Sequence, residues 1–313
     1  MLTSFWEEVA SRLADRWASA VTPALLFWVG GMLALVWERG GTSGVAEPAD
    51  WIARLPWPVQ AAVLVAALAI VLTSALVVRR LITPVLRLLE GYWPSPLEPV
   101  RQRLVARHAA RAAKLQDAWS NLAPGIDEDT ASPQERAEYV RLDRRLRRMP
   151  DRPADIMPSH LGNILRAGES RPFTKYGLDP VKCWPHLWLL LPEQVRDELT
   201  AARASLDAAV ASFLWGLLFL TWIPWTAWAA VLGIVVSGAA YRFWIPNRAE
   251  VFADLVEAAF DLHRRRLYDA LRWPLPADPA DEFATGPLLT TYLWRGSDAA
   301  TPTFTAGGEA TVD

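Results

Sequence analysis

The sequence predicts an all-α polytopic membrane protein with four transmembrane helices, arranged as two hairpins, and a helical cytoplasmic domain. Hydrophobic residues make up 52% of the 313 residues and charged residues 21%, and the two classes are segregated along the chain. Uncharged apolar segments recur at lengths that fit a bilayer. Many of the 17 tryptophans flank these segments, as expected of side chains that prefer the membrane interface.

The first predicted hairpin covers residues 21–78, with spans at 21–37 and 57–78 that carry no charged side chain. Residues 1–20 place Phe5, Val9 and Leu13 at helical spacing among charged residues. This pattern predicts an amphipathic helix at the membrane interface rather than a cleaved signal peptide.

The second predicted hairpin covers residues 207–241, with spans at 207–223 and 225–241 and a turn at Pro224. Pro192 is suited to the first position of a helix, and the apolar face that follows stays in register up to residue 223. We therefore expect one uninterrupted helix from the cytoplasmic domain into the third span.

Small residues within the spans should allow close packing of helices. They are Gly30, Gly31, Ala62, Ala66, Gly233 and Ser237. Because they supply more close-packing surface than four spans need, we also expect self-association, as a symmetric dimer.

The distribution of arginine predicts the orientation. Arg79, Arg80 and Arg87 follow the second span, whereas the turn at Pro224 has no Lys or Arg. The positive-inside rule therefore places both termini and the middle of the chain in the cytoplasm. The predominance of arginine over lysine and the abundance of alanine favour a bacterial plasma (inner) membrane protein.

The cytoplasmic domain is predicted to be residues 79–206. Ser132 and Glu135 form a capping-box pattern that starts a helix ending before Pro150. Ser159 is expected to cap a short helix over 160–167 that Gly168 stops.

Residues 242–295 are predicted to form a C-terminal amphipathic helix with an extension. Pro246 should open this helix, which should end near Trp273. The small and polar residues 296–313 predict a disordered tail.

The sequence has no spacing typical of a catalytic, nucleotide-binding or metal site, so we expect neither an enzyme nor a cofactor. Cys183 and His186 are too few for a structural metal site and are interpreted as a buried thiol and a core histidine. His160, Asn163 and Arg166 could line a phosphate or nucleotide pocket, but a polar face packed within the domain is favoured.

Arginines just after the second span and near residue 145 are candidates for contact with anionic headgroups or with a protein partner. They are Arg79, Arg80, Arg87, Arg141, Arg144, Arg145, Arg147 and Arg148. A net charge of −2 and interspersed carboxylates argue against nucleic acid. A helix whose arginines pair only with these carboxylates is an equally weighted alternative.

The interiors of the spans lack ionisable residues, which disfavours a transporter. The function that remains is a membrane-anchored interaction or scaffold module whose cytoplasmic domain binds a protein partner. The alternative is a membrane-active effector that oligomerises and permeabilises the bilayer.

Overall fold

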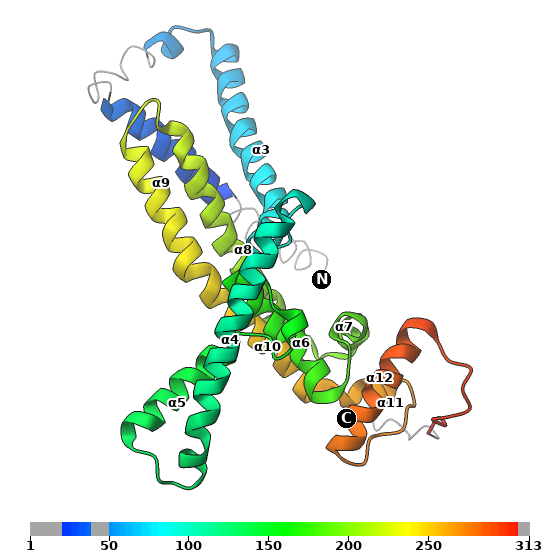
Figure 1. The fold of residues 1–313 in the computed structure, drawn as a ribbon. Coiled ribbons are helices and arrows are strands. Elements are labelled where there is room, and N and C mark those ends of the chain that lie inside the picture. Colours follow the sequence, from blue (N-terminus) through cyan, green and yellow to red (C-terminus); the bar gives the residue numbers. More distant parts are fainter. Residues whose placement is uncertain (1–20, 39–49, 306–313) are drawn as a thin grey trace. The chain divides into compact units, whose positions relative to one another are not determined.

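The computed structural model describes residues 21–38 and 50–305, and in this part of the chain all regular secondary structure is helical (Figure 1). The all-α prediction is therefore confirmed there. The predicted interfacial helix at 1–20, part of the first loop at 39–49 and the last tail residues 306–313 lie outside the described residues.

The principal helices are numbered as in Figure 1. They are Val21–Glu38, α3 (Trp57–Glu90), α4 (Glu98–Asp127), α5 (Pro133–Leu146), α6 (His160–Tyr176), α7 (Pro180–Leu190), α8 (Glu193–Phe219), α9 (Trp228–Ala239), α10 (Ile245–His263), α11 (Arg265–Ala270) and α12 (Pro279–Arg295). Short 3₁₀ turns at Ser95–Leu97, Pro153–Asp155 and Leu220–Trp222 and a π-helical segment at Ala240–Trp244 complete them.

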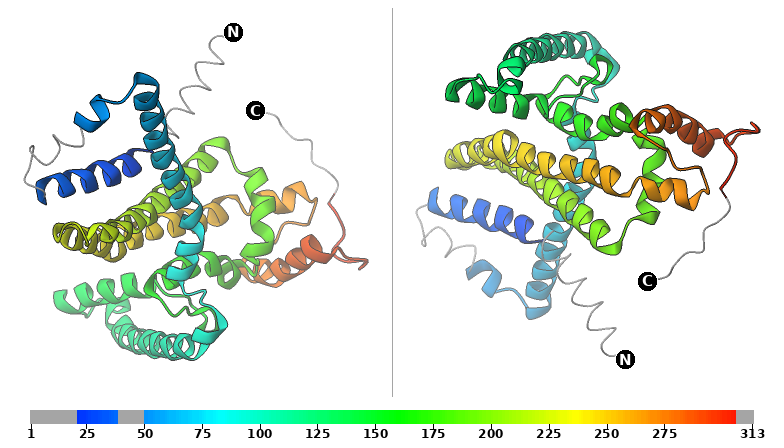
Figure 2. Two further views of the ribbon diagram at one scale, coloured as in Figure 1. Left: turned by 90° about the horizontal axis from the view of Figure 1, so that it is seen from above. Right: turned by 90° about the horizontal axis from the view of Figure 1, so that it is seen from below.

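The chain divides into two units. The first comprises Met1–Leu86 and Asp207–Ile245, and the second comprises Arg87–Leu206 and Pro246–Asp313. Helices α3 and α8 each contribute residues to both units. Within the second unit, α4 and α5 lie side by side as a helical hairpin (Figures 1 and 2).

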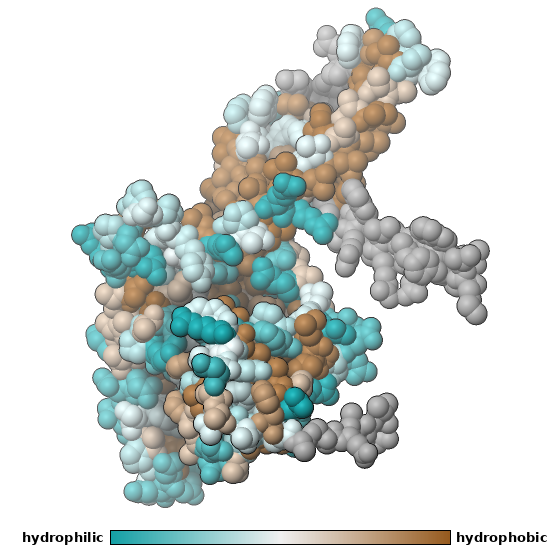
Figure 3. All heavy atoms as spheres, turned by 90° about the vertical axis from the view of Figure 1, so that its right-hand side faces the viewer, coloured by the Kyte–Doolittle hydropathy of each residue, from teal (hydrophilic) through white to brown (hydrophobic). Residues whose placement is uncertain are grey.

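Four helical stretches are long and apolar enough to cross a membrane, in agreement with the number of spans predicted. They are Val21–Glu38, the stretch that begins at Trp57, Glu193–Trp222 and Trp228–His263. Their apolar side chains are largely exposed; Leu26, Val65 and Ile234, for example, retain 67%, 65% and 64% of their accessible surface. Figure 3 shows this surface as mostly hydrophobic. A large exposed apolar surface is unfavourable in water and is typical of a membrane or protein contact.

Helices α8 and α9 pack closely through small residues in the first unit. A Cβ atom added to Gly233 would lie 2.8 Å from the carbonyl oxygen of Gly216, so only glycine permits this approach. The Ser237 hydroxyl donates a hydrogen bond to the Phe213 carbonyl at 3.3 Å. A hydroxyl that bonds a neighbouring helix is a common contact in membrane helix packing.

Aromatic side chains join Val21–Glu38 to α8 and the turn that follows it. The Phe27 ring lies 5.2 Å from the Trp215 ring and 6.1 Å from the Phe219 ring, centroid to centroid. The Trp222 ring covers Gly31 so closely that a side chain there would overlap it. A second link runs to α3, because Trp28 Nε1 donates to Ser74 Oγ at 3.2 Å.

The second unit has its own hydrophobic core, formed where α7, α8, α10, α11 and α12 meet. Its buried members are Leu178, Cys183, Leu187, Leu191, Leu199, Val256, Ala259, Phe260, Leu267, Tyr268, Trp273 and Leu289. The remaining helices of this unit, α4, α5 and α6, border the candidate site.

Two predicted helix starts in this unit are confirmed, but one predicted end is wrong. Ser132 and Glu135 form the capping box of α5, and Ser159 caps α6 by accepting from the Gly162 amide at 2.9 Å. Helix α6 does not stop at Gly168 and continues to Tyr176. Gly168 instead lies against α10, where an added Cβ would be 2.7 Å from the Ala253 carbonyl oxygen. This glycine therefore serves close helix packing rather than termination.

Pro246 does not open a helix, contrary to prediction. It lies in the first turn of α10, directly after the π-helical segment Ala240–Trp244, and the backbone stays helical through both. A proline removes one helix hydrogen bond, and the π-helical segment lies directly before the position where this bond is missing.

The helix predicted to run from Pro246 to near Trp273 is divided into two helices in the structure. Helix α10 ends at His263 and α11 ends at Ala270. A further helix, α12, begins after the cap Asp278, whose carboxylate accepts from the Asp281 amide at 2.8 Å.

Candidate functional site: an arginine pocket and an adjoining trough

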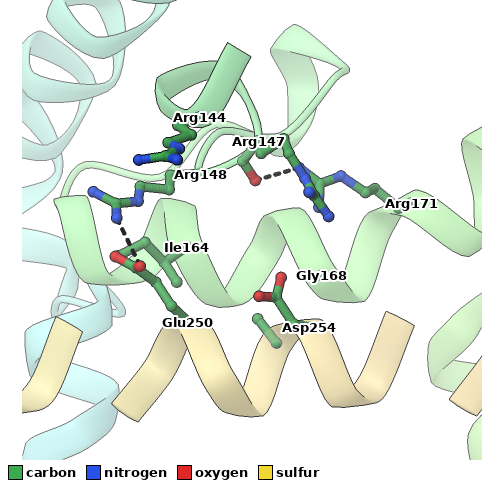
Figure 4. A pocket seen from close by; sticks show the side chains of 9 residues that line it. Arg144, Arg147, Arg148, Ile164, Gly168, Arg171, Glu250 and Asp254 are labelled. Carbon is green, nitrogen blue, oxygen red and sulfur yellow. Dashed lines mark hydrogen bonds and ion pairs between the residues drawn. The ribbon is translucent and has the colours of Figure 1, made fainter. Parts of the chain in front are cut away.

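Two hollows lie in the second unit. The first, the arginine pocket, has a volume of about 140 Å³ and lies between the end of α5, α6 and α10 (Figure 4). The second, the trough, has a volume of about 540 Å³ and lies between α4, the end of α5 and the segment before α6. Arg147 and Arg171 line both hollows, so the two are neighbours.

The lining of each hollow mixes charge with apolar surface. The arginine pocket is lined by Arg144, Arg147, Arg148, Ile164, Gly168, Arg171, Glu250, Ala253 and Asp254. The trough is lined by Ala109, Ala112, Ala113, Gln116, Trp119, Asp143, Leu146, Arg147, Met149, Pro150, Asp151, Pro153, Ile156, Arg171, Lys175 and Glu257.

Local rules of helix geometry place the arginines of α5 at the pocket. The capping box fixes the start of the helix, since Glu135 Oε2 accepts from the Ser132 amide at 2.7 Å. Arg144 then lies in the last turn and Arg147 at the C-cap, where the Arg147 amide bonds the Asp143 carbonyl at 2.9 Å. Positive side chains are favourable at this end because the helix dipole is negative there.

An ion network ties α6 to α10 beside both hollows. Glu257 accepts from Arg171 Nη1 and from Lys175 Nζ, each at 2.6 Å, and Lys175 also reaches Asp261 at 2.9 Å. The side chains of Arg171 and Glu257 are only 9% and 10% exposed. Arg171 Nη2 additionally donates to the Arg147 carbonyl, which joins the end of α5 to the network.

Electrostatics keep Glu257 charged in this setting. Burial raises the pKa of its carboxyl, but hydrogen bonds from Lys175 and Arg171 outweigh burial, so the pKa lies below its ordinary value. A buried carboxylate with two cationic donors is a fixed, oriented charge. It holds the Arg171 guanidinium in place at the junction of the two hollows.

A second set of polar contacts holds the segment that forms one wall of the trough. The Asp155 carboxylate, 6% exposed, binds Arg152 at 2.6 Å and Arg166 at 2.7 Å. Asn163 bonds the Met157 amide and carbonyl at 2.8 and 3.0 Å. Asn163 and Arg166 therefore form hydrogen bonds and ion pairs within the unit. This agrees with the packing role that the sequence analysis favoured over a nucleotide pocket.

The two candidate metal-binding residues, Cys183 and His186, line neither hollow. Cys183 is fully buried in α7, and burial raises the pKa of its thiol to about 11. His186 is exposed and its Nδ1 lies 3.2 Å from the Lys182 carbonyl, so the expectation of a core histidine is wrong. Among the described residues, no cluster of three or more His, Cys, Asp or Glu side chains could hold a metal ion.

The structure brings together only some of the predicted arginines. Arg144, Arg147 and Arg148 line the pocket, and Arg148 binds Glu250 at 2.8 Å. Arg141 points elsewhere and binds Glu138 at 3.2 Å, while Arg145 is exposed outside the pocket. Three further predicted residues are exposed on α3: Arg79, Arg80 and Arg87.

The predicted packing residues also divide into two groups. Gly233 and Ser237 contact α8, and the Phe219 and Trp222 rings cover Gly30 and Gly31. Ala62 and Ala66, on α3, are exposed.

Sequence reasoning missed the α6–α10 network, although a signal for it exists. Arg171 and Lys175 are four residues apart, and so are their partners Glu257 and Asp261, so each pair shares one helix face. The alanine face of α4 was also missed. It ends at Trp119, whose ring stacks on Tyr139 with centroids 5.2 Å apart. In the described part of the chain, the buried Trp119 Nε1 has no hydrogen-bond partner.

Neither protein-family models, curated proteins nor solved structures give a match to this chain.

Proposed function

We propose that this chain is a bacterial plasma-membrane protein that holds a protein partner on its cytoplasmic unit. In this proposal the four apolar helices cross the bilayer as two hairpins and both termini are cytoplasmic. The count of four apolar helices and the arginines that follow the second span support this topology. The second unit then serves as the interaction module.

The observation that carries the proposal is the incomplete packing of α4. This helix has 30 residues and none of them is buried. Helices in proteins derive most of their stability from packing an apolar face against other elements. The part of α4 that lines the trough therefore leaves surface for a further element.

The trough fits one face of a partner helix. Ala109, Ala112, Ala113 and Gln116 share one face of α4, and their small side chains allow the backbone of another helix to come close. Trp119 continues the same face of α4 and lines the trough. Docking of an amphipathic helix into an apolar groove is a common mode of recognition, and a volume of about 540 Å³ leaves room for its anchoring side chains.

A pair of matched substitutions tests the proposal. Ala113→Trp fills the trough, whereas Ala118→Trp adds the same side chain to an exposed position on the opposite face of α4. Full-length protein is purified from its own membranes in mild detergent, and the co-purifying protein is quantified. We expect Ala113→Trp to lose the partner and Ala118→Trp to retain it. Equal retention by both variants would contradict the proposal, and rapid depolarisation on overexpression would favour a membrane-active effector.

A further inference from the structure

The arginine pocket carries more positive than negative charge. Four guanidiniums, those of Arg144, Arg147, Arg148 and Arg171, line it with two carboxylates, those of Glu250 and Asp254. Glu257 binds Arg171 from beside the pocket, so one positive charge remains in excess. Figure 4 shows Arg144 and Arg148 on one side of the pocket, beside Glu250, and Arg147 with Arg171 on the other side, with Asp254 between them.

Two of the four guanidiniums already have carboxylate partners. Arg148 binds Glu250 at 2.8 Å, and Arg171 binds Glu257 at 2.6 Å. Among the described residues, Arg144 and Arg147 form no ion pair within the pocket, and both are exposed. Their guanidiniums are therefore available to a ligand, while the buried Arg171 is fixed.

The floor of the pocket favours a small, compact ligand. Gly168 brings the backbones of α6 and α10 so close that an added Cβ would lie 2.7 Å from the Ala253 carbonyl oxygen. The remaining hollow of about 140 Å³ suits a single tetrahedral group rather than an extended one. Charges in such a partly enclosed site are screened less by water than charges on an open surface.

We infer that the arginine pocket binds the dianion of a phosphate monoester. A phosphate monoester carries nearly two negative charges at neutral pH, enough to pair with both available guanidiniums, those of Arg144 and Arg147, and its oxygens suit the planar fork of arginine. The phosphate is either the headgroup of a lipid of the phosphatidic acid type or a soluble phosphate. A bare cation is disfavoured, because Asp254 is the only lining carboxylate without an ion pair in the described chain. The inference is independent of the partner helix proposed for the trough.

The test uses full-length protein in a neutral detergent, with inorganic phosphate titrated calorimetrically at constant ionic strength. Arg144→Gln/Arg147→Gln removes the two available guanidiniums. Arg141→Gln/Arg145→Gln removes the same charge from the same helix outside the pocket. We expect saturable binding that weakens by roughly tenfold to a hundredfold for each pocket arginine lost, and little change in the control. Binding should also weaken from pH 7.5 to pH 5, because the second pKa of phosphate is about 6.

A second arm distinguishes the two sources of phosphate. Nanodiscs that contain phosphatidic acid are compared with nanodiscs that contain phosphatidylglycerol, a phosphodiester without the dianion. Pocket-dependent preference for phosphatidic acid identifies a lipid headgroup, and pocket-dependent binding of inorganic phosphate alone identifies a soluble ligand. If both double variants lose binding equally, or if phosphate shows no saturable binding in either arm, the inference is overturned.

Two further variants keep the test informative if the glutamine double variant unfolds. Arg144→Lys/Arg147→Lys retains the charge but removes the fork geometry, so binding should be weakened but not lost. Asp254→Asn removes a carboxylate from the lining and should tighten phosphate binding several-fold. Weaker phosphate binding by Asp254→Asn would contradict the inference.

Discussion

Replacement of Glu257 by glutamine should destabilise the second unit by about 3 kcal/mol. Glu257 is the shared acceptor of Arg171 and Lys175, at 2.6 Å from each. The substitution keeps the size of the side chain but leaves the Arg171 guanidinium, 9% exposed, without its carboxylate. Breaking a buried ion pair from one side costs about 3–5 kcal/mol. We expect the lower end, because Arg171 keeps its bond to the Arg147 carbonyl and Lys175 keeps Asp261.

The assay is urea unfolding of the full-length protein in mild detergent, followed by helical circular dichroism. Glu138→Gln is the matched control, since its ion pair with Arg141 is 44% and 65% exposed and should contribute less than about 1 kcal/mol. A loss of less than about 1 kcal/mol for Glu257→Gln would refute the reasoning, because the network would then contribute no more than a surface pair.

The stabilisation that Glu257 contributes should also depend on pH, and its sign follows from the direction of the pKa shift. The folded-state pKa of Glu257 lies below its ordinary value, so its carboxylate stabilises the fold at pH values above that ordinary value of 4.5. This stabilisation is lost as the pH falls through the lowered pKa. The difference in unfolding free energy between wild type and Glu257→Gln should therefore be constant near neutral pH and shrink under acid conditions. A difference that grows as the pH falls would contradict the account.

Three further outcomes follow from close packing and burial. Gly168→Ala should lower the free energy of unfolding by about 1–3 kcal/mol, because the new Cβ would crowd the Ala253 carbonyl. The control Gly125→Ala, whose Cβ would have no neighbour closer than 3.7 Å, should be neutral or stabilising by up to about 1 kcal/mol in the same unfolding assay. Gly233→Ile should separate α8 from α9, because even a Cβ would lie 2.8 Å from the Gly216 carbonyl oxygen; a spin-label distance between the two helices should lengthen, and an unchanged distance would count against this packing. Cys183 should resist thiol reagents at pH 8 until the protein unfolds, because its thiol is fully buried with a pKa of about 11; rapid labelling of the native protein, followed by mass spectrometry, would contradict that burial.

Features that depend on neighbouring residues could be predicted from the sequence. The apolar helices follow from long uncharged segments, and the start of α5 follows from Ser132, Pro133 and Glu135, which act within one helical turn. The start of α6 at Ser159 is equally local.

Features that depend on residues far apart in the chain could not be predicted in the same way. Gly168 looks like a helix stop until α10 is placed against it, and Pro246 looks like a helix start until the π turn before it is known. The arginines of α5 were identified, but Arg171 and Glu257 are 86 positions apart and only the fold brings them together. Local propensity is a weak guide where such tertiary contacts decide.

The most direct test of the account is the side of the membrane on which each part of the chain lies. Two single-cysteine proteins, Ser43→Cys and Ala131→Cys, are made with Cys183 replaced by alanine and are labelled in intact cells with a membrane-impermeant maleimide. The account predicts that the reagent labels position 43 from outside and labels position 131 only after the membrane is opened. Labelling of position 131 but not of position 43 in intact cells would contradict the proposed topology and, with it, a partner-binding unit in the cytoplasm.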